Sequence, residues 1–96
     1  MKHVLESDIE AECMRLVRKA GGEHRKLDVG TGAKGWLDQA VWLPGWHFIV
    51  EFKRPGGKLS ALQTRRIARL RALEHEVYVI DNVPDFESLL TRHTLA

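Results

Sequence analysis

Two strand-like runs of residues meet at Pro44-Gly45 and carry three charged side chains, Asp38, Glu51 and Lys53. A Pro-Gly pair between two apolar runs is typical of a hairpin turn. A two-residue turn pairs the residues on either side of it, which places Asp38 directly opposite Glu51, with Cβ atoms about 4.5–5.5 Å apart. Two carboxylates at this distance can share one divalent cation. Lys53 lies two residues beyond Glu51 and therefore points to the same face.

The two faces of this hairpin differ in polarity. Apart from Gln39, one face is apolar and carries Leu37, Val41, Leu43, Phe48, Val50 and Phe52. The other face combines the three charged residues with Ala40, Trp42 and Ile49. Charges at one end of an apolar surface are costly unless they are paired or bound to a metal. A cross-strand ion pair of Lys53 with one carboxylate is the alternative to a metal site, but it leaves the other carboxylate without a partner.

The rest of the chain must supply the elements that position these residues. Helical spacing of apolar residues and strand-like runs predict helices at 7–20, at 59–73 and from residue 84 or 85 onward, and strands at 24–29, 36–43, 46–53 and 76–80. Three glycines within residues 30–35 predict a loop. The order α-β-β-β-α-β-α predicts one α/β domain, in which a mixed central sheet is flanked by helices.

These residues resemble a known nuclease pattern. Asp38 and Glu51-Phe52-Lys53, preceded by an acidic helix, are similar to the PD-(D/E)xK nuclease superfamily. The run Gly56-Gly57-Lys58-Leu59-Ser60-Ala61-Leu62-Gln63, followed by a basic helix and by Val77-Tyr78-Val79-Ile80-Asp81, resembles more narrowly a VRR-NUC domain. The resemblance covers the chain from about Glu6 to Leu90. One departure is Leu37, since the family often has proline before its metal-binding aspartate.

The resemblance implies a small restriction-endonuclease-like fold and a metal-dependent phosphodiesterase. Asp38, Glu51 and the backbone carbonyl of Phe52 would hold Mg²⁺ or Mn²⁺ through oxygen ligands. The metal would orient the scissile phosphate and acidify a water. Lys53 would position that water or neutralise the charge that develops on phosphorus. These roles are implied by the family pattern and are expectations for this chain.

A helical glutamate completes the family pattern, and Glu6 and Glu10 are the two candidates. They are four residues apart and therefore lie on the same flank of the first predicted helix. Glu10 lies eleven residues before Gly21, which resembles the spacing in related junction resolvases, so we expect Glu10 to be catalytic, with Glu6 as the substitute. The alternative for Glu10 is a capping box in which Ser7 is the N-cap residue.

Gln63 is expected to support the active site. It lies within the apolar stripe of the second predicted helix, which consists of Leu59, Leu62, Leu70 and Leu73. A polar amide in such a stripe needs hydrogen-bond partners. The family places a glutamine here that supports the catalytic residues. The alternative is a glutamine at the margin of the stripe that bonds to the backbone.

Basic residues gather after the predicted hairpin, although the formal net charge is only +2. The side chains expected to follow DNA phosphates are Lys34, Arg54, Lys58, Arg65, Arg66 and Arg69. A solvated helix face is the alternative for Arg65, Arg69 and Arg71. The single cysteine, Cys13, excludes an internal disulfide and is expected to be buried and inert.

Length and composition fit one globular domain. The chain has 96 residues, of which 44 % are hydrophobic and 29 % charged, and these values argue against disorder. It has no apolar run that could span a bilayer and no signal-peptide pattern at its start, so we expect a cytoplasmic protein without a membrane partner.

The resemblance finally implies a substrate. VRR-NUC domains of this kind are similar to dimeric nucleases that resolve four-way (Holliday) junctions in DNA recombination and repair, in phages and bacteria. We therefore expect a homodimer that acts on branched DNA. Two alternatives stay open. One is a flap or duplex endonuclease with the same chemistry, and the other is a DNA-binding subunit that works with a helicase.

Overall fold

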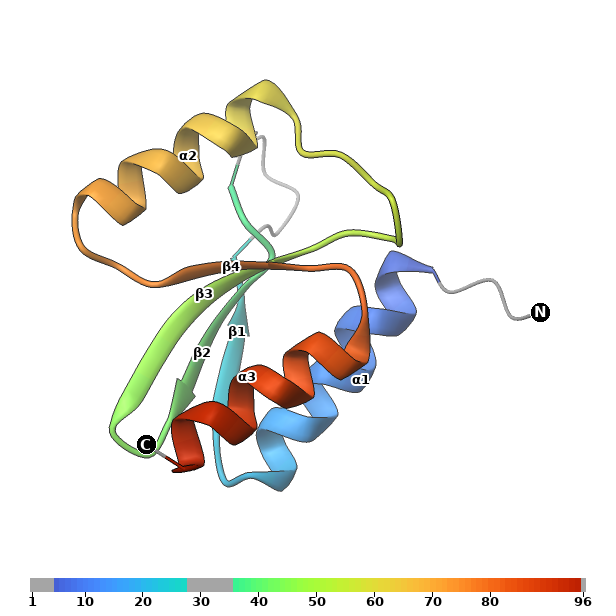
Figure 1. The fold of residues 1–96 in the computed structure, drawn as a ribbon, viewed down its shortest axis with the longest axis vertical. Helices are drawn as coiled ribbons and strands as arrows, with labels where there is room; N and C mark the ends of the chain where they lie inside the picture. Colours follow the sequence, from blue (N-terminus) through green and yellow to red (C-terminus); the bar gives the residue numbers. More distant parts are fainter. Residues whose placement is uncertain (1–4, 28–35, 96) are drawn as a thin grey trace.

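The computed structural model describes residues 5–27 and 36–95 and shows a four-stranded sheet with helices on both faces (Figure 1). Its elements are, in order, α1 (Glu6–Lys19), β1 (Glu23–Lys26), β2 (Gln39–Leu43), β3 (Trp46–Phe52), α2 (Ala61–Ala72), β4 (Val77–Ile80) and α3 (Val83–Leu95). The predicted order α-β-β-β-α-β-α is confirmed. The predicted glycine-rich loop at 30–35 lies outside the described residues.

The strands lie in the order β1-β2-β3-β4, and only the last pair is parallel. Two parallel neighbours need a crossover connection, and α2 provides it between β3 and β4. The hairpin of β2 and β3 has the predicted register, because Leu43 pairs with Trp46 and Gln39 pairs with Val50. Gly45 in its turn has a φ of 68°, which glycine adopts readily.

Helices α1 and α3 lie side by side on one face of the sheet, and α2 lies on the other (Figure 1). The larger core lies under α1 and α3 and is built from Ile9, Cys13, Met14, Val17, Val41, Phe48, Val50, Phe52, Ile80, Phe86 and Leu89. A smaller core lies under α2 and contains Leu37, Ile67 and Val77. Cys13 is fully buried as expected, and burial raises the pKa of its thiol to about 12, so it is not a nucleophile at neutral pH.

Leu37 was expected to share a face with Val41, but it packs with Ile67 and Val77 under α2 instead. The paired part of β2 begins only at Gln39, so strand alternation does not extend back to Leu37. The chain bends at Asp38, and this bend carries Leu37 to the opposite side of the sheet.

The helix starts also differ in part from expectation. Helix α1 begins at Glu6 with Leu5 as its N-cap residue and no side-chain cap, so the alternative considered for Glu10, a capping box with Ser7 as N-cap residue, is wrong. Helix α2 has a true capping box between Ser60 and Gln63. Its expected leucine stripe is wrong at two positions, since Leu62 and Leu73 are 46 % and 48 % exposed.

The buried flank of α2 follows a spacing of three to four residues, as a helix that covers a sheet must. Ile67 is its buried residue, and Leu59 and Leu70 are partly buried beside it. Gln63 falls in the same row. In the described ranges, 5–27 and 36–95, no helix is long and apolar enough to cross a bilayer.

Candidate active site

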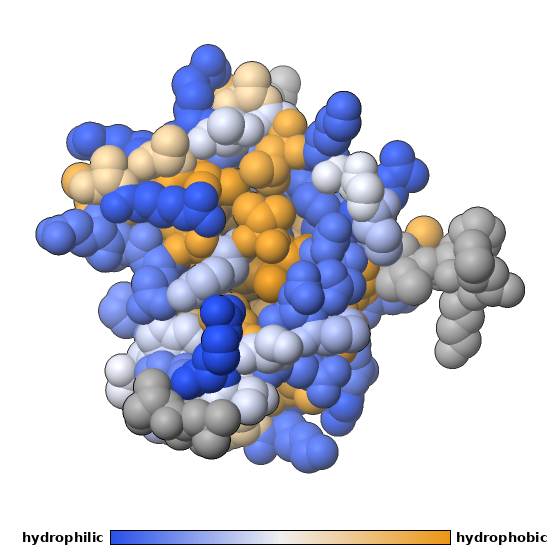
Figure 2. Space-filling view, in the orientation of Figure 1, coloured by the Kyte–Doolittle hydropathy of each residue, from blue (hydrophilic) through white to orange (hydrophobic). Residues whose placement is uncertain are grey.

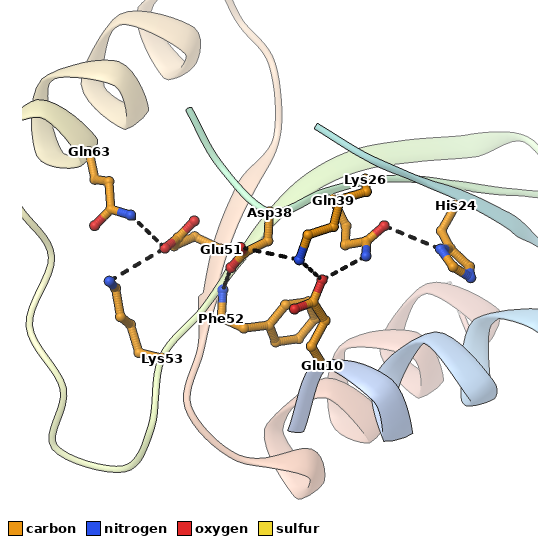
Figure 3. A network of polar contacts seen from close by, with 9 residues as sticks. All are labelled: Glu10, His24, Lys26, Asp38, Gln39, Glu51, Phe52, Lys53 and Gln63. Atoms are coloured by element: carbon orange, nitrogen blue, oxygen red, sulfur yellow. Dashed lines mark hydrogen bonds and ion pairs between the residues drawn. The ribbon is translucent and has the colours of Figure 1, made fainter. Parts of the chain in front are cut away.

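Four chain segments converge at one end of the sheet: the first turns of α1 and α2, the start of β2 and the end of β3. In Figure 3, Gln63 and Lys53 approach Glu51 from one side, while Lys26 and Glu10 approach Asp38 from the other. The predicted juxtaposition of Asp38 and Glu51 follows from the hairpin register, because Gln39 and Val50 are directly paired.

Asp38 is anchored to the neighbouring strand by a backbone hydrogen bond. The amide N–H of Phe52 donates to Asp38 Oδ2 at 2.7 Å. Burial raises the pKa of Asp38, the bond from Phe52 opposes this, and the negative charge of Glu10 adds to it. The aspartate is thus held in place at the end of β3, at an energetic cost for its charged form.

Glu51 is the most buried of the acidic groups at the site, with 2 % of the residue exposed. Gln63 Nε2 donates to Glu51 Oε2 at 2.7 Å, and Lys53 Nζ lies 3.5 Å from the same oxygen. Glu51 Oε1 is buried and has no hydrogen-bond partner among the described residues. Burial, followed by the negative charge of Asp38, raises the pKa of Glu51 to about 7, although Lys53 opposes the shift. An unpaired oxygen of this kind is costly unless a cation binds it.

Gln63 combines the two roles that were weighed for it. Its Oε1 accepts from the backbone N–H of Ser60 at 3.0 Å, which closes the capping box of α2. Its Nε2 then faces Glu51. The cap therefore orients the amide so that its donor end is directed at the buried carboxylate.

A third carboxylate joins the pair from α1, and it belongs to Glu6. One carboxylate oxygen from each of Glu6, Asp38 and Glu51 lies within 4.8 Å of the others. Three carboxylates in this arrangement offer the oxygen donors that a hard divalent cation prefers. We refer to these three residues as the carboxylate cluster.

Glu10, the expected helical carboxylate, lies in a neighbouring network. Its Oε2 accepts from Lys26 Nζ at 2.8 Å and from Gln39 Nε2 at 2.7 Å. Lys26 Nζ is also 3.9 Å from Asp38 Oδ1, so this network adjoins the carboxylate cluster (Figure 3). Sequence reasoning missed Lys26. For Gln39, the only sequence signal was that it is a single polar residue on an otherwise apolar strand face.

The expected DNA-binding residues follow the chain away from the site. Arg54 and Lys58 are exposed in the connection from β3 to α2, and Arg65 and Arg69 are exposed on α2. The guanidinium carbon of Arg66 lies 4.2 Å from the centroid of the Trp36 ring, in a cation–π contact. Lys34 lies outside the described residues.

Comparisons with known proteins agree with this geometry. No family model matches the chain. A curated relative from Acyrthosiphon pisum secondary endosymbiont phage 1, named "Putative nuclease p44", is 42 % identical over 91 residues, which cover 94 % of this chain and 96 % of the relative. A solved structure described as a VRR_NUC domain matches with a TM-score of 0.79 and 27 % identity, over 90 % of this chain and 94 % of that one. The chain belongs to the VRR-NUC family of nucleases.

Proposed function

We propose that this protein is a DNA endonuclease that depends on a divalent metal ion held by Glu6, Asp38 and Glu51. The observation that carries the proposal is the carboxylate cluster, whose oxygens lie within 4.8 Å of one another in a VRR-NUC fold. The buried Oε1 of Glu51 fits a cation ligand, because the residues that the structure describes leave that oxygen without a hydrogen-bond partner.

Mg²⁺ or Mn²⁺ fits the donor set, which consists of oxygens alone. The carbonyl of Phe52 is a fourth candidate ligand, since this residue directly follows Glu51 and its amide is already bonded to Asp38. A divalent cation at this position supplies Lewis-acid stabilisation of the scissile phosphate and a water of lowered pKa.

The chain's own groups hold this arrangement and complete it. Gln63 fixes Glu51, and the Phe52 amide fixes Asp38, so both strand carboxylates are oriented before substrate binds. The Lys53 ammonium, 3.5 Å from Glu51, places a positive charge where negative charge develops on phosphorus during hydrolysis.

We assign the helical ligand to Glu6 in preference to Glu10. Glu6 lies in the carboxylate cluster, whereas Glu10 is already paired with Lys26 and Gln39. The assignment can be tested by calorimetric titration of Mn²⁺ into wild type, Glu6→Gln and Glu10→Gln. We expect the Mn²⁺ affinity to fall at least 10-fold in the Glu6 variant only. A fall in the Glu10 variant alone would reverse the assignment.

The DNA would leave the site along α2. Arg54, Lys58, Arg65, Arg66 and Arg69 lie on the segment that follows Lys53, and their charges suit contacts with phosphates. The contact of Arg66 with Trp36 holds one of these guanidinium groups beside a tryptophan that is 38 % exposed.

A four-way junction cut by a homodimer is the substrate we propose. The molecule measures 39 × 34 × 22 Å, so one copy covers about one turn of duplex, which is about 34–36 Å long. One copy carries one carboxylate cluster among its described residues. Paired cuts in a junction need two active sites and therefore two copies. Exposed apolar side chains that a second copy could cover are Leu62, Leu73 and Val79. Figure 2 shows hydrophobic residues gathered on the face that carries β4 and α2.

The deciding experiment compares cleavage of labelled four-way junction, flap and linear duplex in Mg²⁺, Mn²⁺ or EDTA, for wild type and Lys53→Ala. We expect paired cuts in the junction that disappear in EDTA and in the variant, and a dimer by light scattering. Equal cutting of flaps or duplex would keep the metal-dependent nuclease and remove the junction preference. No metal-dependent cleavage of any substrate would overturn the proposed function and favour a DNA-binding subunit.

A further inference from the structure

Lys26, the last residue of β1, lies beside the carboxylate cluster on the side away from Lys53. Its Nζ is 2.8 Å from Glu10 Oε2 and 3.9 Å from Asp38 Oδ1. Its side chain is 47 % exposed, whereas the side chains of Glu10 and Asp38 are 14 % and 15 % exposed. The ammonium is therefore held by two largely buried carboxylates and yet remains within reach of a molecule in solution.

A chain of polar contacts fixes the carboxylate that holds Lys26. Gln39 is only 5 % exposed, and its Nε2 donates to Glu10 Oε2 at 2.7 Å. The Oε1 of Gln39 lies 3.2 Å from His24 Nδ1, and His24 Nε2 lies 2.7 Å from a terminal nitrogen of Arg18. A buried amide with both ends bonded has one orientation available, so Glu10 is held in one position and Lys26 with it.

We propose that Lys26 is a second lysine that contacts DNA at this site, with Glu10 and Gln39 as its positioning residues. The inference rests on the proposed function. A phosphate that approaches three clustered carboxylates is repelled unless cations are near. Lys53 lies 3.5 Å from Glu51 and Lys26 lies 3.9 Å from Asp38, so each strand carboxylate has a lysine beside it. Lys53 is 15 % exposed, and Lys26 is the more accessible of the two.

The competing explanation is that Lys26 only balances the charges of Glu10 and Asp38 in the folded protein. Salt dependence of DNA binding separates the two explanations. A lysine that contacts a phosphate releases a counterion on binding, so its removal lowers the slope of log affinity against log salt concentration by about one unit. A lysine that only pairs with protein carboxylates does not change this slope.

The experiment measures binding of a short DNA duplex over a series of salt concentrations, with Ca²⁺ in place of Mg²⁺ to slow cleavage. The proteins are wild type, Lys26→Met, Lys26→Arg and Lys19→Ala, where Lys19 is an exposed matched control at the far end of α1. We expect a slope lower by about one unit in Lys26→Met, restored in Lys26→Arg and unchanged in Lys19→Ala. Thermal unfolding of each variant shows that it is folded under the same conditions.

A double-mutant cycle tests whether Glu10 acts through Lys26. Lys26→Met should lower kcat/KM for DNA cleavage about 10-fold, the effect of one hydrogen bond to a charged group. Glu10→Gln should lower it in wild type but change it little when Lys26 is already methionine. Equal effects of Glu10→Gln in both backgrounds would overturn the positioning role.

The failure of this inference can be told apart from the failure of the proposed function. A wild type that binds and cuts DNA, with an unchanged salt slope in Lys26→Met, overturns the role of Lys26 and leaves the nuclease. A wild type that neither binds nor cuts DNA overturns both.

Discussion

Glu51 lies near the end of β3, whereas Glu76 directly precedes β4 and contacts Trp46 at the start of β3, and the two carboxylates differ in their hydrogen-bond partners. Glu76 is exposed, and both of its oxygens accept hydrogen bonds from Trp46 Nε1, at 3.1 and 3.0 Å. The Tyr78 hydroxyl donates to Glu76 as well. Glu51 is buried, and its Oε1 has no partner among the residues that the structure describes.

The pKa values of the two groups follow from these surroundings. The hydrogen bond from Tyr78 and the smaller contribution of Trp46 hold the pKa of Glu76 below its usual range. Burial and the charge of Asp38 raise the pKa of Glu51 to about 7. A carboxylate whose two oxygens both accept hydrogen bonds stabilises the fold. A buried carboxylate with an oxygen that lacks a partner is a candidate ligand for a metal ion. One end of β3 thus contacts an acid with a structural role, Glu76, and the other end carries a candidate metal ligand, Glu51.

The largest expected effect is on cleavage, and it separates the two glutamates. Glu51→Gln removes a proposed metal ligand, and we expect the single-turnover rate in Mg²⁺ to fall about 10³-fold or more. Glu76→Gln should leave the rate within about twofold, because Glu76 contacts Trp46 at the start of β3, at the opposite end of that strand from Glu51. Similar losses in both variants would contradict the assignment of different roles.

The two glutamates should also shift stability with pH in opposite directions. The pKa of Glu51 is raised from 4.5 to about 7 on folding, so the metal-free protein loses stability as the pH rises through this window. We expect the free energy of unfolding in EDTA to be about 3 kcal/mol lower at pH 8 than at pH 4.5, as measured with urea. Glu51→Gln should remove most of this loss, and a persistent loss in the variant would exclude Glu51 as its source.

The pKa of Glu76 is lowered on folding, so its contribution has the opposite sign. Its stabilising effect is present above the usual pKa of a glutamate and is lost as the pH falls through the lowered value. Glu76→Gln should therefore reduce the sensitivity of the protein to acid, while the loss of stability at high pH persists. Urea unfolding between pH 3 and pH 6 provides the measurement, and an unchanged acid limb would contradict the prediction.

The smallest expected effect concerns Gln63, which links the cap of α2 to Glu51. Ser60→Ala removes one half of the capping box and should lower the free energy of unfolding by about 1 kcal/mol, with little change in cleavage. Gln63→Ala removes the bond to Glu51 as well and should lower cleavage about 10-fold. If Ser60→Ala lowered cleavage as much as Gln63→Ala, the contact with Glu51 would have no separate role.

Much of this site could be predicted from local sequence. The turn at Pro44-Gly45 and strand alternation together determine the hairpin register, and the register brings Asp38 next to Glu51. The spacing of Gln63 placed it in the apolar row of α2, where an amide needs partners. Each of these relations arises within one hairpin or one helix, where backbone geometry alone sets which side chains are neighbours.

Only the tertiary structure shows which of Glu6 and Glu10 lies in the carboxylate cluster. Both lie on the same flank of α1, but they are four residues apart and therefore separated by about 6 Å along the helix axis. Which of them reaches Asp38 depends on how far α1 extends past the end of the sheet. Packing of Ile9, Cys13 and Val17 against the sheet determines that position, and no local pattern encodes it.

Three further features could not be predicted from local sequence patterns: the position of Lys26, the position of Leu37 and the contact between Arg66 and Trp36. Lys26 meets Glu10 and Asp38 only because β1 joins the edge of the hairpin, and Leu37 crosses to the α2 side where the chain bends. The sequence by itself determined the order of elements and the pairing of the two strand carboxylates, because these follow from short-range periodicity and turn chemistry. Its motifs indicated the family by resemblance. The positions of Glu6 and Lys26 beside the strand carboxylates depend on packing between elements that are distant in sequence. The side-chain volumes in the assembled core determine that packing.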